Sequence, residues 1–135
     1  MNQPPLSVKF ASIFSESPVE VVMELIEKLD DKPNVLFLFC SSSYDLNQLS
    51  MILDQSFSCP VVSCTTAGEY SSFHGFTKKS IVAATLKSEN LKVKTYHLNQ
   101  IKNFSLLQGN KLKEQVKNDF YNNDSPGISR FGLLL

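Results

Sequence analysis

The sequence predicts an α/β fold: a mixed sheet that starts as βαβαβ, gains an antiparallel hairpin and carries helices on both faces. Strand-like and helix-like segments alternate through the first half of the chain, as in parallel strands joined by crossover helices. Residues 35–40 (VLFLFC) are all apolar, which is typical of a central strand covered on each side. At 135 residues, 42% of them hydrophobic, the chain has the size of one domain with one core.

The first βα unit has a well-marked helix start. A strand is predicted at 7–14, followed by a helix from Pro18, because Ser17 is a favourable N-cap and proline is tolerated at the first helical position. Pro33 fixes the end of this helix. The side chains predicted to face the core share helical spacing: Val19, Val22, Met23, Ile26 and Leu29.

The second unit repeats this pattern. After the strand at 35–40, the polar turn 41–45 supplies hydroxyls that can cap a helix. A short third strand, 61–64, then leads into the small and polar residues 65–69. The apolar residues that mark the second helix are Leu46, Leu49, Ile52 and Leu53.

The second half of the chain changes character. Residues 81–86 and 91–98 are strand-like and separated by a turn, so we predict a hairpin, with the second strand at an edge protected by lysines. A last helix is predicted at 104–121. Residues 131–135 (FGLLL) have the pattern of a further buried strand, and we therefore expect the chain to be the N-terminal piece of a longer protein.

Charge and cysteine usage argue against several classes of protein. Thirteen basic and thirteen acidic residues give a net charge of zero, so no basic surplus favours nucleic acid or an acidic membrane. The cysteines, odd in number and set in or beside apolar runs, favour reduced thiols and a cytoplasmic location. No signal peptide is recognisable, and no apolar run approaches the ~20 residues of a membrane span.

The turn at 63–69 (SCTTAGE) follows a strand, where open α/β sheets place their ligands. Its small side chains let a ligand approach the backbone, two threonines offer hydroxyls, and Glu69 could receive an ammonium group. The alternative is a simple tight turn, with Gly68 at positive φ and Glu69 solvated. The turn at 40–45 would lie beside it and complete a polar pocket, or merely cap the next helix.

Other chemistry has weaker support. Cys64 with His74 or His97 would form a thiol nucleophile and its base, but neither histidine has a recognisable flanking pattern. The cysteine spacing matches no zinc motif, and no glycine-rich phosphate loop occurs in the sequence. We therefore predict a non-enzymatic domain with no catalytic residue and no metal ligand.

The segments FCSSSYDLNQL, VVSCTTAGEY and SIVAATL occur in the order and spacing of a known family. Together, residues 35–85 resemble the N-terminal part of the FIST domain, a sensory module of bacterial signalling proteins and some eukaryotic F-box proteins. Ser63 stands where that family usually has glycine, and the family's N-terminal region is normally longer. The resemblance identifies residues 1–135 as a FIST-type sensory domain that is truncated at its C-terminal end.

The resemblance implies a non-catalytic sensor that binds a small ligand, such as an amino acid or related carboxylate, without a cofactor. Its partners would be a C-terminal FIST region and a downstream signalling domain or protein, with no nucleic acid and no membrane insertion. Glu69 would counter an amino group, and the hydroxyls and amides of the two turns would receive a carboxylate. The site residues carried over are Cys64, Thr65, Thr66, Gly68 and Glu69, with Ser42, Ser43 and Tyr44 beside them.

Part of the family is associated with haem and nitric-oxide sensing, which requires an axial ligand. His74 is the better candidate for that role, because His97 falls on the predicted edge strand. The alternative for His74 is an exposed loop residue without a ligand.

Overall fold

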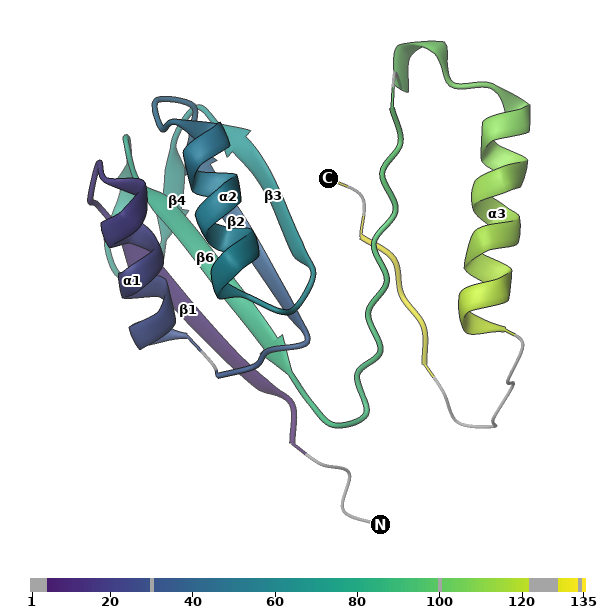
Figure 1. Ribbon diagram of the computed structural model, residues 1–135, viewed down its shortest axis with the longest axis horizontal. Helices are drawn as coiled ribbons and strands as arrows, with labels where there is room; N and C mark the ends of the chain where they lie inside the picture. The colour runs from purple at the N-terminus through teal and green to yellow at the C-terminus, as the bar shows by residue number, and fades with distance from the viewer. Residues whose placement is uncertain (1–4, 30, 100, 122–128, 134) are drawn as a thin grey trace. The chain divides into compact units, whose positions relative to one another are not determined.

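The computed structural model describes residues 5–29, 31–99, 101–121, 129–133 and 135 (Figure 1). The chain forms two compact units, Met1–Val93 and Lys94–Leu135, which are described separately. The first unit contains the sheet and the site predicted from the sequence. The predicted α/β class and mixed sheet are confirmed.

The first unit is built on a four-stranded sheet in the order β1-β6-β2-β3. β2 and β3 are parallel, whereas β6 runs antiparallel to both of its neighbours, β1 and β2. The first three strands therefore run in the same direction, as predicted. The strand bounds are β1 Ser7–Ile13, β2 Val35–Ser41, β3 Val61–Thr66 and β6 Ile81–Lys87.

The predicted hairpin of 81–86 with 91–98 is wrong, because β6 lies inside the sheet between β1 and β2 and residues 91–98 form no strand. The prediction rests on the turn-prone residues 87–90 between the two runs. β6 instead places Ala84 between Phe10 and Phe37, so a small side chain separates two large ones. The hairpin that does form is the separate pair β4 (Glu69–Ser71) and β5 (Gly75–Thr77).

Helices α1 (Pro18–Lys28) and α2 (Leu46–Ser56) both cover the same face of the sheet (Figure 1), so neither of these two supplies the helical cover predicted for the other face. Alternate residues of β2 point into one core with both helices, whereas Phe37 and Phe39 are half-buried. Phe10, in register with Ala84, is 64% exposed. The buried core beneath the helices comprises Ala11, Ile13, Val21, Val22, Leu25, Leu29, Leu36, Leu38, Cys40, Tyr44, Leu49, Leu53, Ile81 and Ala83.

The start of α1 is confirmed, but its predicted buried face is partly wrong. Ser17 is the N-cap, its hydroxyl accepts from the Glu20 amide, and Pro18 opens the helix. The helix is turned so that Val21, Val22, Leu25 and Leu29 are buried, leaving exposed three residues that were predicted to be in the core. Those three are Val19, Met23 and Ile26.

The second unit holds a 3-10 turn, η1 (Ile101–Asn103), and helix α3 (Leu106–Phe120). Ser105 and Gln108 form a capping box at the start of α3, close to the predicted helix start. The Tyr96 hydroxyl donates to Asp119 at 2.7 Å; burial and this bond raise the pKa of Tyr96 to about 12. The buried strand predicted at 131–135 is not found in its described part, where Phe131 is 81% exposed.

The orientation of α1 can be tested with two adjacent positions. Leu25→Ala should lower the free energy of unfolding by about 2–5 kcal/mol, because Leu25 is 0% exposed and its removal leaves a cavity. Ile26→Ala should change it by less than about 1 kcal/mol, because Ile26 is 54% exposed. Urea unfolding followed by circular dichroism measures both, and equal losses would contradict the observed face.

Candidate functional site

Four segments meet at the end of the sheet where β1, β2 and β3 finish and β6 begins. They are the loops after β1, β2 and β3 and the short segment before β6; α1 and α2 also start at this end (Figure 1). Open α/β sheets bind ligands at the carboxyl ends of their strands. Both turns singled out from the sequence are therefore at one end of the sheet.

Glu69 is the most deeply buried charged group of this end, at 3% exposure. The Thr66 hydroxyl donates to its Oε1, and the Ser80 hydroxyl donates to its Oε2 at 2.6 Å. Thr77 Oγ1 lies 2.8 Å from Ser80 Oγ and extends the network. The alternative of a solvated Glu69 is therefore wrong: the carboxylate joins the end of β3 to the start of β6.

Gly68 is required by a close contact rather than by its backbone angle. Among the described glycines only Gly75 has a positive φ, so the alternative of a tight turn with Gly68 at positive φ is wrong. A Cβ on Gly68 would lie 2.3 Å from Cζ of Phe76, closer than side chains pack. The missing side chain leaves room for the Phe76 ring, which comes from β5.

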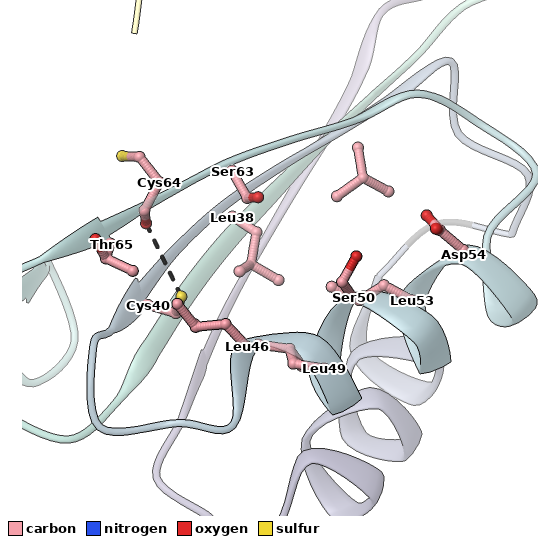
Figure 2. Close-up of a pocket in the computed structure, with 11 residues that line it drawn as sticks. Leu38, Cys40, Leu46, Leu49, Ser50, Leu53, Asp54, Ser63, Cys64 and Thr65 are labelled. Carbon is pink, nitrogen blue, oxygen red and sulfur yellow. Dashed lines mark hydrogen bonds between the residues drawn. The ribbon is translucent and has the colours of Figure 1, made fainter.

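A pocket of about 350 Å³ lies between α2 and β3 (Figure 2). Cys40 directs its Sγ toward the Cys64 carbonyl oxygen at 3.9 Å, whereas the Cys64 sulfur points away from Cys40 (Figure 2). Burial, with Glu69 and Cys64 nearby, raises the pKa of the Cys40 thiol. The pocket is lined by Leu38, Cys40, Leu46, Leu49, Ser50, Leu53, Asp54, Val61, Ser63, Cys64 and Thr65.

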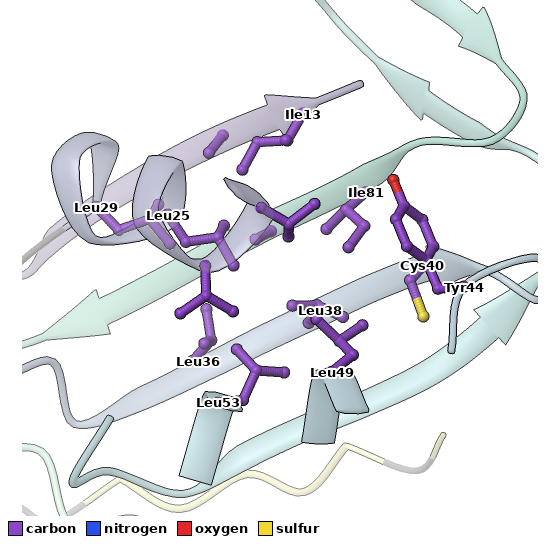
Figure 3. Close-up of a cluster of buried hydrophobic side chains, with 14 residues drawn as sticks. Ile13, Leu25, Leu29, Leu36, Leu38, Cys40, Tyr44, Leu49, Leu53 and Ile81 are labelled. Atoms are coloured by element: carbon purple, nitrogen blue, oxygen red, sulfur yellow. The ribbon is translucent and has the colours of Figure 1, made fainter. Parts of the chain in front are cut away.

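The loop between β2 and α2 is held by its own polar groups. Asp45, rather than a serine, is the N-cap of α2 and accepts from the Gln48 amide at 3.0 Å. Ser41 Oγ and Ser43 Oγ are 2.9 Å apart. Tyr44 lies at the end of the core near Cys40 (Figure 3), and its hydroxyl donates to the Ser15 carbonyl at 2.6 Å.

Tyr44 therefore ties the loop after β2 to the loop after β1. Burial is the main cause that raises the pKa of its phenol, with negative groups nearby adding to it. The phenol thus remains a hydrogen-bond donor at neutral pH. This bond fixes one wall of a second pocket at the same end of the sheet.

The second pocket measures about 230 Å³ and is lined by Glu16, Ser43, Tyr44 and Lys79. Lys79 Nζ is 3.9 Å from Glu16 Oε1, and both side chains are largely exposed. Glu16 and Lys79 were not predicted from the sequence, because each is an ordinary charged loop residue until the position of β6 is known. That position brings the segment before β6 beside the loops that follow β1 and β2.

The predicted site residues fall into separate groups. Ser43 and Tyr44 line the smaller pocket, Cys64 and Thr65 the larger one, and Thr66 and Glu69 form the buried network. Gly68 lies beneath Phe76, and Ser42 is exposed and lines neither pocket.

The two histidines lie outside both pockets. His74 is exposed between β4 and β5, where its ring contacts Phe14 edge-on with centroids 4.9 Å apart. His97 is exposed in the second unit. In the described part of the chain, no group of three or more His, Cys, Asp or Glu side chains is placed to hold a metal ion. None of the described helices combines the length and the apolar character needed to cross a membrane.

The strand order defines an α/β domain in which the loops after three parallel strands gather at one end of the sheet. The family model of the FIST N domain matches residues 34–135, about three-quarters of the chain, and the chain belongs to this family. FIST domains are a family of sensory domains in signalling, to which small-ligand binding is ascribed. No curated protein and no solved structure matches the chain.

The buried carboxylate can be tested by an isosteric change. Glu69→Gln should lower the free energy of unfolding by about 1–3 kcal/mol, because an amide cannot accept both hydroxyl hydrogens as the carboxylate does. Glu89→Gln, at an exposed position, is the control and should change it by less than about 0.5 kcal/mol. Chemical denaturation at neutral pH measures both, and a silent Glu69→Gln would contradict the network.

The Tyr44 bond can be tested by removing one oxygen. Tyr44→Phe should cost about 1–3 kcal/mol of unfolding free energy, because the half-buried Ser15 carbonyl loses its donor. Tyr70→Phe is the matched control, since Tyr70 is 74% exposed. Thermal unfolding of both variants gives the comparison, and an equal change in the two would remove Tyr44 as the tie between the loops.

Proposed function

We propose that this chain is the sensory part of a signalling protein and binds a small ligand, an amino acid or a related carboxylate. The observation that carries the proposal is that the β2–α2 loop borders the smaller pocket at the carboxyl end of the sheet, while strand β3, up to Thr65, borders the larger pocket. The pockets are small, and the smaller lies below the roughly 300–1,000 Å³ of sites for drug-sized molecules. This size suits a single metabolite.

Some polar groups of the site would contact the ligand, and others hold the site in place. Ser43 offers a hydroxyl to the smaller pocket, and Thr65 with the Cys64 backbone borders the larger one. Thr66 and Glu69 act as positioning residues, because their hydrogen bonds hold the β3–β4 turn against β6. Glu69 thus supports the site, while contact with an ammonium group falls to an exposed carboxylate.

The proposal assigns no catalytic residue and no cofactor. The raised pKa of Cys40 keeps its thiol protonated, which disfavours its use as a nucleophile. The Cys64 sulfur points away from Cys40, and of the described residues that line the larger pocket none is a histidine (Figure 2). Output would come from a ligand that binds one conformation better than another, read by a C-terminal FIST region or downstream signalling protein.

A thermal-shift screen against amino acids and related carboxylates tests this function. A ligand at 100 times its dissociation constant adds about 2.7 kcal/mol of stability, which raises the melting temperature of a domain of this size by roughly 10 °C. Ser43→Ala should reduce the response to a ligand of the smaller pocket, whereas Ser72→Ala, in the exposed β4–β5 turn, should not.

Sodium chloride at equal ionic strength controls for general salt effects. A selective shift with a few compounds supports the proposal. Identical shifts with all compounds and with the salt, or no shift with any of them, would contradict small-ligand binding by this chain.

A further inference from the structure

We propose that the pocket lined by Glu16, Ser43, Tyr44 and Lys79 recognises a zwitterionic small molecule, with Lys79 binding its carboxylate and Glu16 its ammonium group. The inference rests on the proposed function, because it assigns the two charges of the ligand to residues of one pocket. Neither charged residue lies in the three sequence segments quoted above for the resemblance.

The two charged groups are close but do not form a hydrogen-bonded ion pair. Lys79 Nζ and Glu16 Oε1 are 3.9 Å apart, longer than the ~2.7–2.9 Å of a charge-assisted hydrogen bond. Their side chains are 70% and 82% exposed, and ion pairs so exposed contribute little to stability. A ligand with one positive and one negative group can therefore replace the pair at small cost and satisfy both side chains.

Lys79 occupies its position despite a backbone penalty. Its φ of 55° lies in the left-handed region, which a glycine would adopt more easily than lysine. Such residues are enriched at functional sites, but Lys32 has a similar φ of 51° and lines neither pocket, so the assignment rests on the charges of the pocket. The next residue, Ser80, is fully buried and its hydroxyl donates to Glu69. These contacts fix the backbone position of Lys79.

The remaining groups of the pocket explain why Glu16 is the acidic partner. Glu69 is buried and accepts hydrogen bonds at both oxygens. Two further carboxylates of this end also have partners: Asp45 accepts from the Gln48 amide, and Glu20 accepts from the Ser15 hydroxyl. The Tyr44 hydroxyl is engaged by the Ser15 carbonyl, so it contributes shape rather than a free donor. Ser43 adds an exposed hydroxyl, and Glu16 is the carboxylate that faces the pocket.

Isothermal titration calorimetry of the full chain tests the assignment. The probes are the common amino acids and, for each one that binds, the analogue without its amino group and the analogue without its carboxyl group. We expect the amino acid to bind at least about tenfold more tightly than either analogue, a difference of about 1.4 kcal/mol. Amino acids that bind no better than both analogues would overturn the proposal.

Two pairs of variants separate the charges. Lys79→Ala should weaken binding of the amino acid about tenfold or more, and Glu16→Gln should remove the preference over the analogue without an amino group. Lys78→Ala and Glu27→Gln are matched controls at exposed positions outside the pocket and should bind as the wild type does.

Lys79→Gly separates loss of binding from loss of stability, which a lysine with only a structural role would not do. It relieves the left-handed strain, so the melting temperature without ligand should stay the same or rise while binding is lost. Wild-type binding that is unchanged in both Lys79→Ala and Glu16→Gln would overturn this assignment and leave the proposed function intact. Absence of binding by the wild type to every probe would overturn both.

Discussion

The insertion of β6 between β1 and β2 is the constraint on which the rest of the first unit depends. β6 is the antiparallel member of the sheet, so its first residues lie at the end where β1, β2 and β3 finish. That placement brings Lys79 and Ser80 to loops that precede them by tens of residues. Without it, the Glu69 network and the smaller pocket would each lose one side.

Glu69 shows that the structure of this end of the sheet depends on assembly of the whole sheet. Removing a carboxylate from water costs several kcal/mol unless its oxygens receive hydrogen bonds. One of its donors comes from the end of β3 and the other from the residue before β6, so the carboxylate is satisfied only when the sheet is assembled. The β3–β4 turn is therefore fixed both by its own Thr66–Glu69 bond and by the tertiary bond from Ser80.

Local signals predicted local structure well, because their physical causes lie within a few residues. The Ser17 cap, the proline at the start of α1 and the interior position of β2 were all readable in this way. Long-range packing could not be predicted in this way. Residues 35–40 are apolar on both faces, but this pattern does not show that one face packs on two helices while Phe37 and Phe39 stay half-buried. Helix α1 is apolar around most of its surface, so spacing alone could not choose Leu25 over Ile26.

The candidate site illustrates the same limit at the level of side chains. The turns were predicted from hydroxyls and a carboxylate, yet Thr66 and Glu69 use these groups on each other. The exposed charges at Glu16 and Lys79 carry no sequence pattern, and only the topology makes them neighbours. Lys79 directly precedes Ser80, whose hydroxyl donates to Glu69, so a ligand bound by Lys79 as proposed would act beside the start of β6. Under the proposed function, such a ligand would shift a conformational equilibrium only by the difference in its affinity for the two states.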